Sequence, residues 1–497
     1  MHDVVRAMTI TIASEGEHNF MVSHHVNSEE FPRRTSYEHF SHMPIVANKF
    51  DELSRPIVCP KLKHLMLKLC FKKPFKLQDN FFNDMGELNV LSLSGYVDSI
   101  LPFPASIKRL SSLRTLCLSN LRLDDISIIG ELVTLEILSI RDSQLEELPM
   151  EIGKLTNLIM LELRNENKEL ERISAGVLSS LVQLEKLYMV GVEYCSYSTL
   201  RELESLPRLT SLTLSRCSGD VIYSNLSLSS KLAWYALTVG GAFIVTSSMD
   251  DYEKIISLEV TETAQLDDWI CHLLKESEFV DSTGDGSNNV LTELQLNEFQ
   301  NIKCLRLSYC KLVTHLLNIS RRIHEVIKFL NLYDLKLESL ECLTHFCNTT
   351  VEGIEFPRLR KMLFHYLPEF QNFWPTANNS ITHSSPLFDE KVCCPRLEEL
   401  YINGANNISA LCSHQLPAAY FSKLETLYVA NCGKLRNLMP PSVTRGLLNL
   451  QKLEIRDCLS MEEVITKEKQ QGEGIMTLFP LLEKLTFTRF LSWGVSF

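Results

Sequence analysis

Cysteine and histidine side chains that lie close together in the sequence are the first candidates for chemistry, because they are the usual ligands of zinc. Cys342, His345 and Cys347 could supply three ligands, and Cys393 and Cys394 form a second group. Neither group has the spacing of a recognised zinc motif. The sequence also contains no phosphate loop of the form G-x-x-x-x-G-K-[ST], no G-x-G-x-x-G and no H-E-x-x-H. We therefore expect no metal site, no cofactor held by this chain alone and no enzymatic activity.

Basic and aromatic side chains form a second set, suited to binding another protein. Arginine, tyrosine and tryptophan are frequent anchors of protein interfaces. The candidates for partner binding are Arg141, Glu162, Arg164, Lys186, Tyr188, Arg306, Tyr333, Tyr401, Tyr428 and Arg456. They occupy equivalent positions of a repeated pattern, and this pattern predicts the elements that hold them.

The repeated pattern is short and apolar. LETLYVANC (424–432) and LQKLEIRDC (450–458) share apolar residues at their first, fourth and sixth positions and a cysteine at the ninth. A unit of this kind, recurring every 20–29 residues or so, is the signature of leucine-rich repeats. Sixteen matches begin at Leu62, Leu88, Leu113, Leu135, Leu158, Leu184, Leu209, Leu232, Ile255, Ile302, Ile327, Leu359, Leu397, Leu424, Leu450 and Leu482.

The spacing predicts an α/β fold, a leucine-rich-repeat solenoid. We expect a curved horseshoe with a parallel β-sheet on the concave face and short helices and loops on the convex face. One repeat cannot bury its own apolar face, so neighbouring repeats must stack. Positions four and six point into the stack, where each buried leucine contributes about 1.5–3 kcal/mol. The ninth position also turns inward, which predicts structural roles for Cys70, Cys217, Cys310, Cys432 and Cys458.

Two degenerate repeats are also expected, one near Phe279 and one before Leu62, near residues 33–37. Polar segments rich in glycine, serine and asparagine indicate loops. These loops are expected at 281–289, 375–386 and 467–475.

Positions three, five and seven of each strand are expected to face the concave side. They hold nine basic and four acidic residues, an excess of five positive charges, whereas the whole chain has a net charge of −12. An acidic surface of a partner protein would be attracted to such a face, while the acidic chain as a whole disfavours nucleic acid. The basic residues are Lys68, Arg141, Arg164, Lys186, Arg306, Lys361, Lys452, Arg456 and Lys484, and the acidic residues are Glu162, Glu259, Glu399 and Glu454. Aromatic residues at these positions are Tyr188, Trp234, Phe329, Tyr333, Tyr401 and Tyr428.

The opening residues MHDVVR resemble the M-H-D motif that ends the nucleotide-binding (NB-ARC) module of plant nucleotide-binding leucine-rich-repeat immune receptors. Stretches such as CPKLKHLMLKLC and MPPSVTRGLLNLQKLEIRDCLSMEEVI are similar to the coiled-coil class of these receptors. The resemblance implies a cytoplasmic disease resistance protein whose repeats recognise a pathogen effector or a guarded host protein. It also implies that the repeats fold back on the chain's own upstream NB-ARC module and hold the receptor inactive.

The resemblance implies a division of the chain into residues 1–32, a C-terminal remnant of the NB-ARC winged-helix module, residues 33–490, a leucine-rich-repeat domain of about 16–18 repeats, and residues 491–497, a truncated tail. Within the motif Met1, His2 and Asp3, the histidine would contact nucleotide phosphates and the aspartate would help to hold the resting state. The phosphate loop would precede residue 1, so ADP or ATP binding is expected only with the upstream module. We expect a truncated gene model, a partial isoform or a degenerate copy.

Two other classes of protein share parts of this pattern. A secreted or cell-surface leucine-rich-repeat binding protein would account for N-glycosylation sequons, but the sequence has no secretion signal, no paired-cysteine caps and no L-x-G-x-I-P repeats. A ubiquitin-ligase substrate adaptor would need an F-box, for which residues 1–32 are too short. The 15 scattered cysteines favour a reducing compartment. The longest apolar run, 232–245, has 14 residues, fewer than the roughly 18–20 of a transmembrane helix. The sequons are at Asn225, Asn318, Asn348, Asn378 and Asn407.

Overall fold

The computed structural model describes most of the chain as two compact units. Unit 1 comprises Met1–Ser218 and Leu226–Leu237, and unit 2 comprises Gly219–Asn225 and Thr238–Phe497. The motif at residues 1–3, the predicted segments 1–32 and 491–497, and Cys70 lie outside the described residues. The described residues are 38, 40–47, 57–69, 77–95, 102–165, 170, 172–191, 195–241, 251–261, 264–319, 326–375, 386–466 and 479–488.

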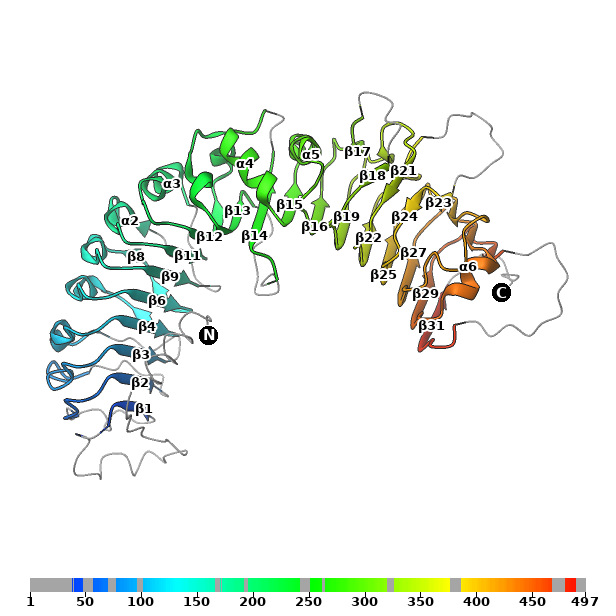
Figure 1. The fold of residues 1–497 in the computed structure, drawn as a ribbon. Helices are drawn as coiled ribbons and strands as arrows, with labels where there is room; N and C mark the ends of the chain where they lie inside the picture. The colour runs from blue at the N-terminus through cyan, green and yellow to red at the C-terminus, as the bar shows by residue number, and fades with distance from the viewer. Residues whose placement is uncertain are drawn as a thin grey trace. The chain divides into compact units, whose positions relative to one another are not determined.

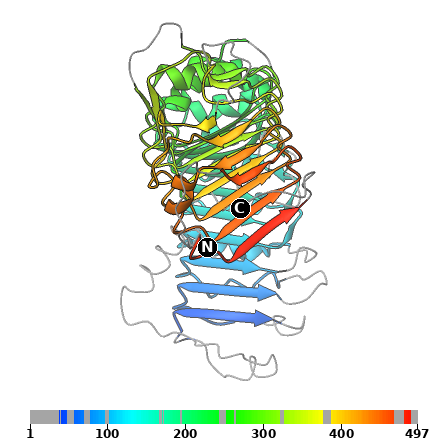
Figure 2. The ribbon, with the colours of Figure 1, turned by 90° about the vertical axis from the view of Figure 1, so that its right-hand side faces the viewer.

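Eighteen strands of the described residues belong to the main sheet, and each pairs in parallel with the strand of a neighbouring repeat. Figure 1 shows these strands on one side of each unit and the helices on the other, and Figure 2 shows the strands side by side and pointing the same way. In unit 1 they are β1 (His42–Ala47), β2 (His64–Leu69), β3 (Val90–Ser94), β4 (Thr115–Ser119), β6 (Ile137–Arg141), β9 (Met160–Arg164), β11 (Lys186–Val190) and β12 (Ser211–Cys217). β13 (Trp234–Val239) has residues in both units. In unit 2 they are β14 (Lys254–Glu259), β15 (Phe279–Thr283), β16 (Cys304–Ser308), β19 (Asp334–Glu338), β22 (Lys361–His365), β25 (Glu399–Asn403), β27 (Thr426–Ala430), β29 (Lys452–Arg456) and β31 (Lys484–Thr488).

Shorter elements lie outside the main sheet. Short pairs in unit 1 join β5 (Arg122–Leu123) to β7 (Gln144–Leu145) and β8 (Glu147–Leu148) to β10 (Arg172–Ile173). Unit 2 has three small sheets: β17 (His315–Leu317) with β20 (His345–Cys347); β18 (Val326–Lys328), β21 (Gly353–Glu355) and β24 (Val392–Cys393); and β23 (Pro386–Phe388), β26 (Ala410–Cys412), β28 (Asn437–Met439) and β30 (Glu463–Ile465). The α-helices are α2 (Val177–Ser180), α3 (Tyr197–Glu204), α4 (Asp268–Glu276), α5 (Ser287–Leu296) and α6 (Pro441–Gly446). The 3-10 helices are η3 (Ala105–Arg109), η4 (Ser127–Glu131), η5 (Met150–Lys154), η6 (Gly219–Tyr223) and η7 (Leu228–Lys231). Among the described residues, no helix has the length and apolar character to cross a membrane.

The strands form because alternate residues are apolar, and the stack forms because those residues need a neighbour. In β3 the leucines of positions four and six, Leu91 and Leu93, are fully buried, whereas Ser92 between them is half-buried. Leu335 and Leu337 of β19 repeat this arrangement in unit 2. The predicted leucine-rich-repeat solenoid with a parallel sheet is therefore confirmed. We call the sheet side that carries positions three, five and seven the β-face.

A left-handed residue ends most strands of the main sheet, which the apolar pattern did not predict. At position eight, non-glycine residues have φ between 50° and 59°, at Asn120, Asp142, Arg216, Tyr309, Ser339, Tyr366, Asn431 and Asp457. This conformation aims the backbone N–H at the next repeat. Tyr309 N, for example, donates to Glu338 O at 3.0 Å, and Tyr366 N donates to Asn403 O at 2.6 Å. A non-glycine residue in this conformation costs roughly 1–2 kcal/mol, and the hydrogen bond between repeats offsets part of that cost.

The cysteines at position nine are buried as predicted. Cys217, Cys310, Cys432 and Cys458 are at most 2% exposed. The thiol of Cys432 donates to Ala430 O at 3.2 Å, and that of Cys310 lies 3.2 Å from Ser287 Oγ. A thiol is small enough for the stacked interior and satisfies nearby oxygens. Burial raises the pKa of Cys310 to about 11.

The two degenerate repeats are present, but one predicted loop is wrong. β15 is the repeat expected near Phe279, and β1 precedes Leu62, although residues 33–37 lie outside the described part. The segment 281–289 is not a loop, because it contains the end of β15 and the start of α5. Its serines are compatible with burial because Ser282 Oγ and Ser287 Oγ lie 2.8 Å apart and hydrogen-bond each other. The predicted loops at 375–386 and 467–475 fall almost wholly outside the described residues.

A chain of phenylalanines stacks through the interior of unit 2. The ring of Phe329 lies 4.9 Å from that of Phe356, and Phe346 lies 5.2 Å from Phe373. Phe373 in turn lies 5.9 Å from Phe388. Phe329 is 2% exposed, so its predicted place on the binding face is wrong. These rings support the later repeats from the side opposite the β-face.

Replacing Gly191 by alanine should destabilise the protein more than replacing Gly176. Both glycines have positive φ, 75° and 82°, so both substitutions carry the left-handed penalty. A Cβ on Gly191 would lie 1.6 Å from Asn165 O, whereas a Cβ on Gly176 meets nothing within 4 Å. The clash should cost Gly191→Ala an additional 1–3 kcal/mol or so. Urea denaturation of the two variants measures the difference; equal midpoints would contradict the close contact.

Native thiol labelling should separate the cysteines into two groups. Cys342 and Cys393 are exposed, and Cys217 and Cys432 are buried. The pKa of both Cys217 and Cys432 is raised by a hydrogen bond that each thiol donates to a neighbouring cysteine sulfur and by burial, which leaves little thiolate at pH 8. Mass spectrometry after iodoacetamide treatment should find the exposed pair alkylated at once and the buried pair only after addition of urea. Rapid alkylation of Cys217 or Cys432 in native protein would show that position nine is not buried.

Candidate functional site

The β-face is the candidate site, and the structure corrects the register of two repeats on it. Asp334 pairs with Cys304, and Glu338 pairs with Ser308, so the repeat begins at Leu332 and not at Ile327. Tyr333 therefore occupies position two, just before the strand begins, and not one of the three positions that form the β-face. Two overlapping sequences fit the repeat pattern here. One begins at Ile327, within β18, and the other begins at Leu332. The second, LYDLKL (332–337), leads into the strand of the main sheet.

The second correction concerns β14. Ser257 pairs with Asp281, and Asp281 pairs with Arg306, which places all three at position five. The repeat therefore begins two residues before Ile255. With both registers corrected, positions three, five and seven of the eighteen strands hold ten basic and seven acidic residues, an excess of three and not of five. The charged residues that these corrections add to the β-face are Asp281, Asp334, Lys336 and Glu338. The last three follow from the alternative match to the repeat pattern that begins at Leu332.

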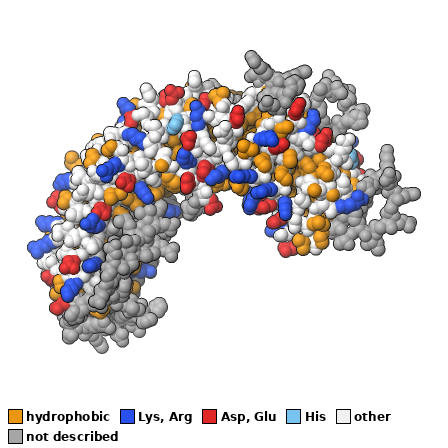
Figure 3. Space-filling model, in the orientation of Figure 1, with side chains coloured by type: hydrophobic (Ala, Val, Ile, Leu, Met, Phe, Trp, Pro, Cys, Tyr) orange, Lys and Arg blue, Asp and Glu red, His pale blue; other side chains and the backbone are white. Residues whose placement is uncertain are grey.

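Most charges of the β-face are paired with each other. Lys361 Nζ lies 2.8 Å from Glu399 Oε1, and Arg456 Nη2 lies 2.7 Å from Glu454 Oε2. Lys484 Nζ lies 2.5 Å from the other oxygen of Glu454. In Figure 3 basic and acidic side chains are interspersed on the visible surface of both units. The predicted strongly basic face is thus a face of mixed charge, which favours a partner with both signs of charge over a uniformly acidic one.

Five of the candidate residues come together on three adjacent strands of unit 1. Arg141 ends β6, and its Nε lies 2.7 Å from Oε1 of Glu162 on β9. Ser139 Oγ donates to the other oxygen of Glu162 at 2.7 Å. Glu162 is only 2% exposed, so the arginine compensates a carboxylate that water cannot reach. Arg141 therefore has a structural role in addition to any contact with a partner.

The other unit 1 candidates surround this ion pair. Arg164 lies opposite Arg141 in the sheet register, and Tyr188 lies opposite Glu162. Lys186 is at the start of the same strand as Tyr188. The ring of Tyr188 lies 5.9 Å from that of Trp234, and burial raises the pKa of the tyrosine. The cluster places the rings of Tyr188 and Trp234 beside the basic side chains of Arg141, Arg164 and Lys186. Aromatic and arginine side chains are frequent anchors of protein interfaces.

Four candidates lie on the β-face of unit 2. Tyr401 and Tyr428 are directly opposite on β25 and β27, with ring centroids 6.0 Å apart. Arg456 follows on β29 with its partner Glu454. Arg306 lies on β16, where its guanidinium is 4.9 Å from the Phe279 ring centroid.

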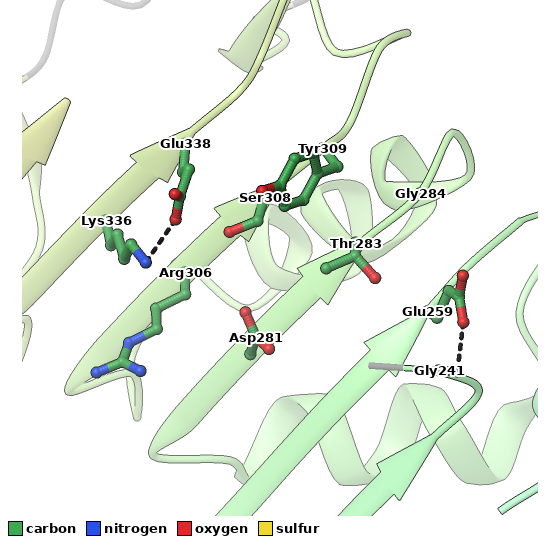
Figure 4. A pocket seen from close by; sticks show the side chains of 10 residues that line it. All are labelled: Gly241, Glu259, Asp281, Thr283, Gly284, Arg306, Ser308, Tyr309, Lys336 and Glu338. Atoms are coloured by element: carbon green, nitrogen blue, oxygen red, sulfur yellow. Dashed lines mark hydrogen bonds and ion pairs between the residues drawn. The ribbon is translucent and has the colours of Figure 1, made fainter. Parts of the chain in front are cut away.

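A polar pocket of about 480 Å³ opens on the β-face of unit 2. Figure 4 shows its charged side chains on four neighbouring strands. Glu259 lies on β14, Asp281 on β15, Arg306 on β16, and Lys336 with Glu338 on β19. Among the described residues, no group of three or more His, Cys, Asp or Glu side chains is placed to hold a metal ion.

Two leucine-rich-repeat family models match parts of this chain. The model of the leucine-rich repeats of plant disease resistance proteins of the RPS2-like kind matches residues 396–490, and a leucine-rich repeat region model matches residues 71–233. A probable disease resistance protein of Arabidopsis thaliana is 35% identical over 122 residues, which cover 24% of this chain and 14% of that protein. Disease resistance protein SUMM2 of the same plant is 36% identical over 122 residues, 24% of this chain and 13% of its own length. The chain thus matches only 13–14% of the length of these relatives.

Solved structures of similar chains are also leucine-rich-repeat proteins or receptor ectodomains. The functional domain of InlJ from Listeria monocytogenes has a TM-score of 0.42 and 14% identity, and covers 80% of this chain and 68% of that one. The plant peptide hormone receptor RGFR1, solved in complex with RGF2, has a TM-score of 0.38 and 14% identity, with coverage of 87% and 79%.

Removing the cation of the buried pair should destabilise unit 1. Arg141→Met leaves Glu162 buried without its counter-charge, which costs on the order of 3 kcal/mol. Arg114→Met is the matched control, because Arg114 pairs with Glu136 across neighbouring repeats but its side chain is 60% exposed. The free energy of unfolding of the control variant should fall by less than about 1 kcal/mol. Urea denaturation followed by circular dichroism measures both, and equal losses would contradict a structural role for Arg141.

Proposed function

We propose that this leucine-rich-repeat chain is the non-catalytic recognition module of a cytoplasmic plant immune receptor, and that its β-face binds a pathogen effector or a guarded host protein. The observation that carries the proposal is the β-face itself, where rigid strands present half-exposed aromatic and charged side chains in clusters. Parallel strands hold such side chains at fixed spacing, so little conformational entropy is lost on binding. The match of residues 396–490 to repeats of plant disease resistance proteins supports the biological setting.

We also propose an autoinhibitory role, in which the repeats contact the chain's own upstream NB-ARC module. The resemblance of MHDVVR to the end of that module supports this proposal. ADP or ATP would be bound by the upstream module, with His2 and Asp3 contributing from this chain. These residues lie outside the described part, so the proposal rests on the sequence.

One of the five sequons takes part in a contact between repeats. Asn348 Oδ1 accepts a hydrogen bond from Ile319 N at 2.8 Å, which ties the side chain to the neighbouring repeat. A glycan on its amide nitrogen would have to be accommodated at this partly buried contact.

Substitution of β-face aromatics should weaken partner binding without unfolding the chain. A yeast two-hybrid screen of libraries of pathogen effectors and host leaf proteins identifies partners of the unmodified chain. The double variant Tyr401→Ala, Tyr428→Ala should bind each purified partner at least tenfold more weakly, because each aromatic anchor contributes more than about 1–2 kcal/mol to binding. Tyr197→Ala with Leu448→Ala is the control, since both residues are exposed and lie outside the main sheet, Tyr197 in α3 and Leu448 two residues after α6.

The control variant should bind as the unmodified chain does. A partner that still binds the tyrosine variant but no longer binds the control variant would place the interface on the helical side. An absence of partners in both libraries would contradict direct recognition of either protein class.

A further inference from the structure

The pocket of unit 2 has two basic side chains placed side by side. Arg306 and Lys336 are directly opposite in the register of β16 and β19. Like charges in this arrangement repel each other. Lys336 Nζ is held 2.5 Å from Glu338 Oε2, whereas the nearest carboxylate oxygen to Arg306, on Asp334, is 3.9 Å away. The arginine is therefore the less closely paired of the two cations.

The guanidinium of Arg306 has unused donor capacity. Its one ion pair among the described residues is the 3.9 Å contact, which is too long for a hydrogen bond. Its Nε is buried and has no hydrogen-bond acceptor among the described residues. Guanidinium donors match the two oxygens of a carboxylate, so the pocket offers a site for an acidic group.

The opposite side of the pocket is acidic. Asp281 is 4% exposed, and its Oδ2 accepts a hydrogen bond from Ser257 Oγ at 2.9 Å. Glu259 accepts one from the backbone N–H of Gly241. Both partners are neutral, and within the described part neither carboxylate has a basic side chain within 4.0 Å. Burial raises the pKa of Asp281, and the hydrogen bond from Ser257 and the charges of Arg306 and Lys336 offset part of that rise.

The two sides are separated by a distance that the sheet sets. Glu259 lies on β14 and Arg306 on β16, two strands apart, and neighbouring strands are about 4.8 Å apart. The charged groups of a ligand that bridges the pocket must therefore be about 5–10 Å apart. An extended polypeptide presents residues i and i+2 on one face about 6.6–6.8 Å apart, which fits this range.

The rim of the pocket carries an exposed aromatic ring. Tyr309 is 64% exposed and follows β16 in the left-handed conformation, with φ 56°. Figure 4 shows it beside Ser308 and above Thr283. A ring at this place can cover the aliphatic part of a bound side chain. The volume of about 480 Å³ is within the usual range of ligand pockets, roughly 300–1,000 Å³.

From these features we infer that the pocket binds a short extended segment of the partner protein that carries one basic and one acidic side chain two residues apart. The basic group lies between Glu259 and Asp281, and the acidic group lies against Arg306. The inference rests on the proposed function, because it assumes that the β-face receives a protein. It adds a place and a charge pattern to that recognition.

The test uses the full chain and three blocked pentapeptides with threonine at the remaining positions. One peptide has lysine second and aspartate fourth, and the others replace either the lysine by glutamine or the aspartate by asparagine. Binding is measured by saturation-transfer NMR titration. The dipolar peptide should bind at least tenfold more tightly than either singly charged peptide. Equal binding of all three, or equally tight binding of free lysine, would overturn the inference.

Variants of the pocket show which residue recognises each charged group of the peptide. Glu259→Gln should remove the preference for lysine, and Arg306→Gln should remove the preference for aspartate. Lys275→Gln, an exposed change on helix α4 of the same unit, should leave all affinities unchanged. Far-UV circular dichroism confirms that each variant is folded. Preferences that survive both pocket substitutions would overturn the assignment.

The outcome is distinguishable from failure of the proposed function. A protein partner that binds the β-face with the same affinity after Glu259→Gln and Arg306→Gln would leave the proposed function standing and overturn the pocket. A dipolar peptide that binds through these residues while the partner screen finds no protein would support the pocket and overturn the recognition of effectors or guarded proteins.

Discussion

Stacking of incomplete repeats is the constraint on which the rest of the structure depends. Each repeat has leucines at positions four and six that cannot be buried within the repeat itself. Leu91 and Leu93, or Leu335 and Leu337, become inaccessible only because a neighbouring repeat covers them. Each such leucine contributes about 1.5–3 kcal/mol, so the stack is held by many similar contributions and not by one core.

Stacking alone would leave the repeats free to slide, and the backbone hydrogen bonds between them fix the register. The left-handed residue at position eight carries one of these bonds, as between Tyr309 N and Glu338 O. Because side chains alternate along a strand, this register decides which residues reach the β-face. The same constraint places Glu162 opposite Tyr188 and Arg306 opposite both Asp281 and Lys336. The chemistry of the face therefore follows from the register.

The β-face combines two kinds of charge pair with different consequences. The pair of Arg141 with the buried Glu162 stabilises the fold, since the carboxylate is shielded from water. The exposed pairs, such as Lys361 with Glu399, contribute little to stability and can be exchanged for contacts with a partner. In the pocket of unit 2, Arg306, Asp281 and Glu259 belong to neither kind, because their own neighbours satisfy them incompletely.

The sequence by itself determined the repeat, the parallel sheet, the buried leucines and the inward cysteines, because these depend on local spacing and on apolar burial. It also placed Arg141, Glu162, Tyr188, Tyr401 and Tyr428 at the correct repeat positions. Only the tertiary structure decided where two matches overlap, as at 327–337, because the choice depends on which strand pairs with β16. It likewise decided that Phe329 is buried among other rings, that residues 281–289 pack as strand and helix, and that acidic residues offset most of the basic ones. These outcomes depend on contacts between repeats, and a pattern read within one repeat does not contain them.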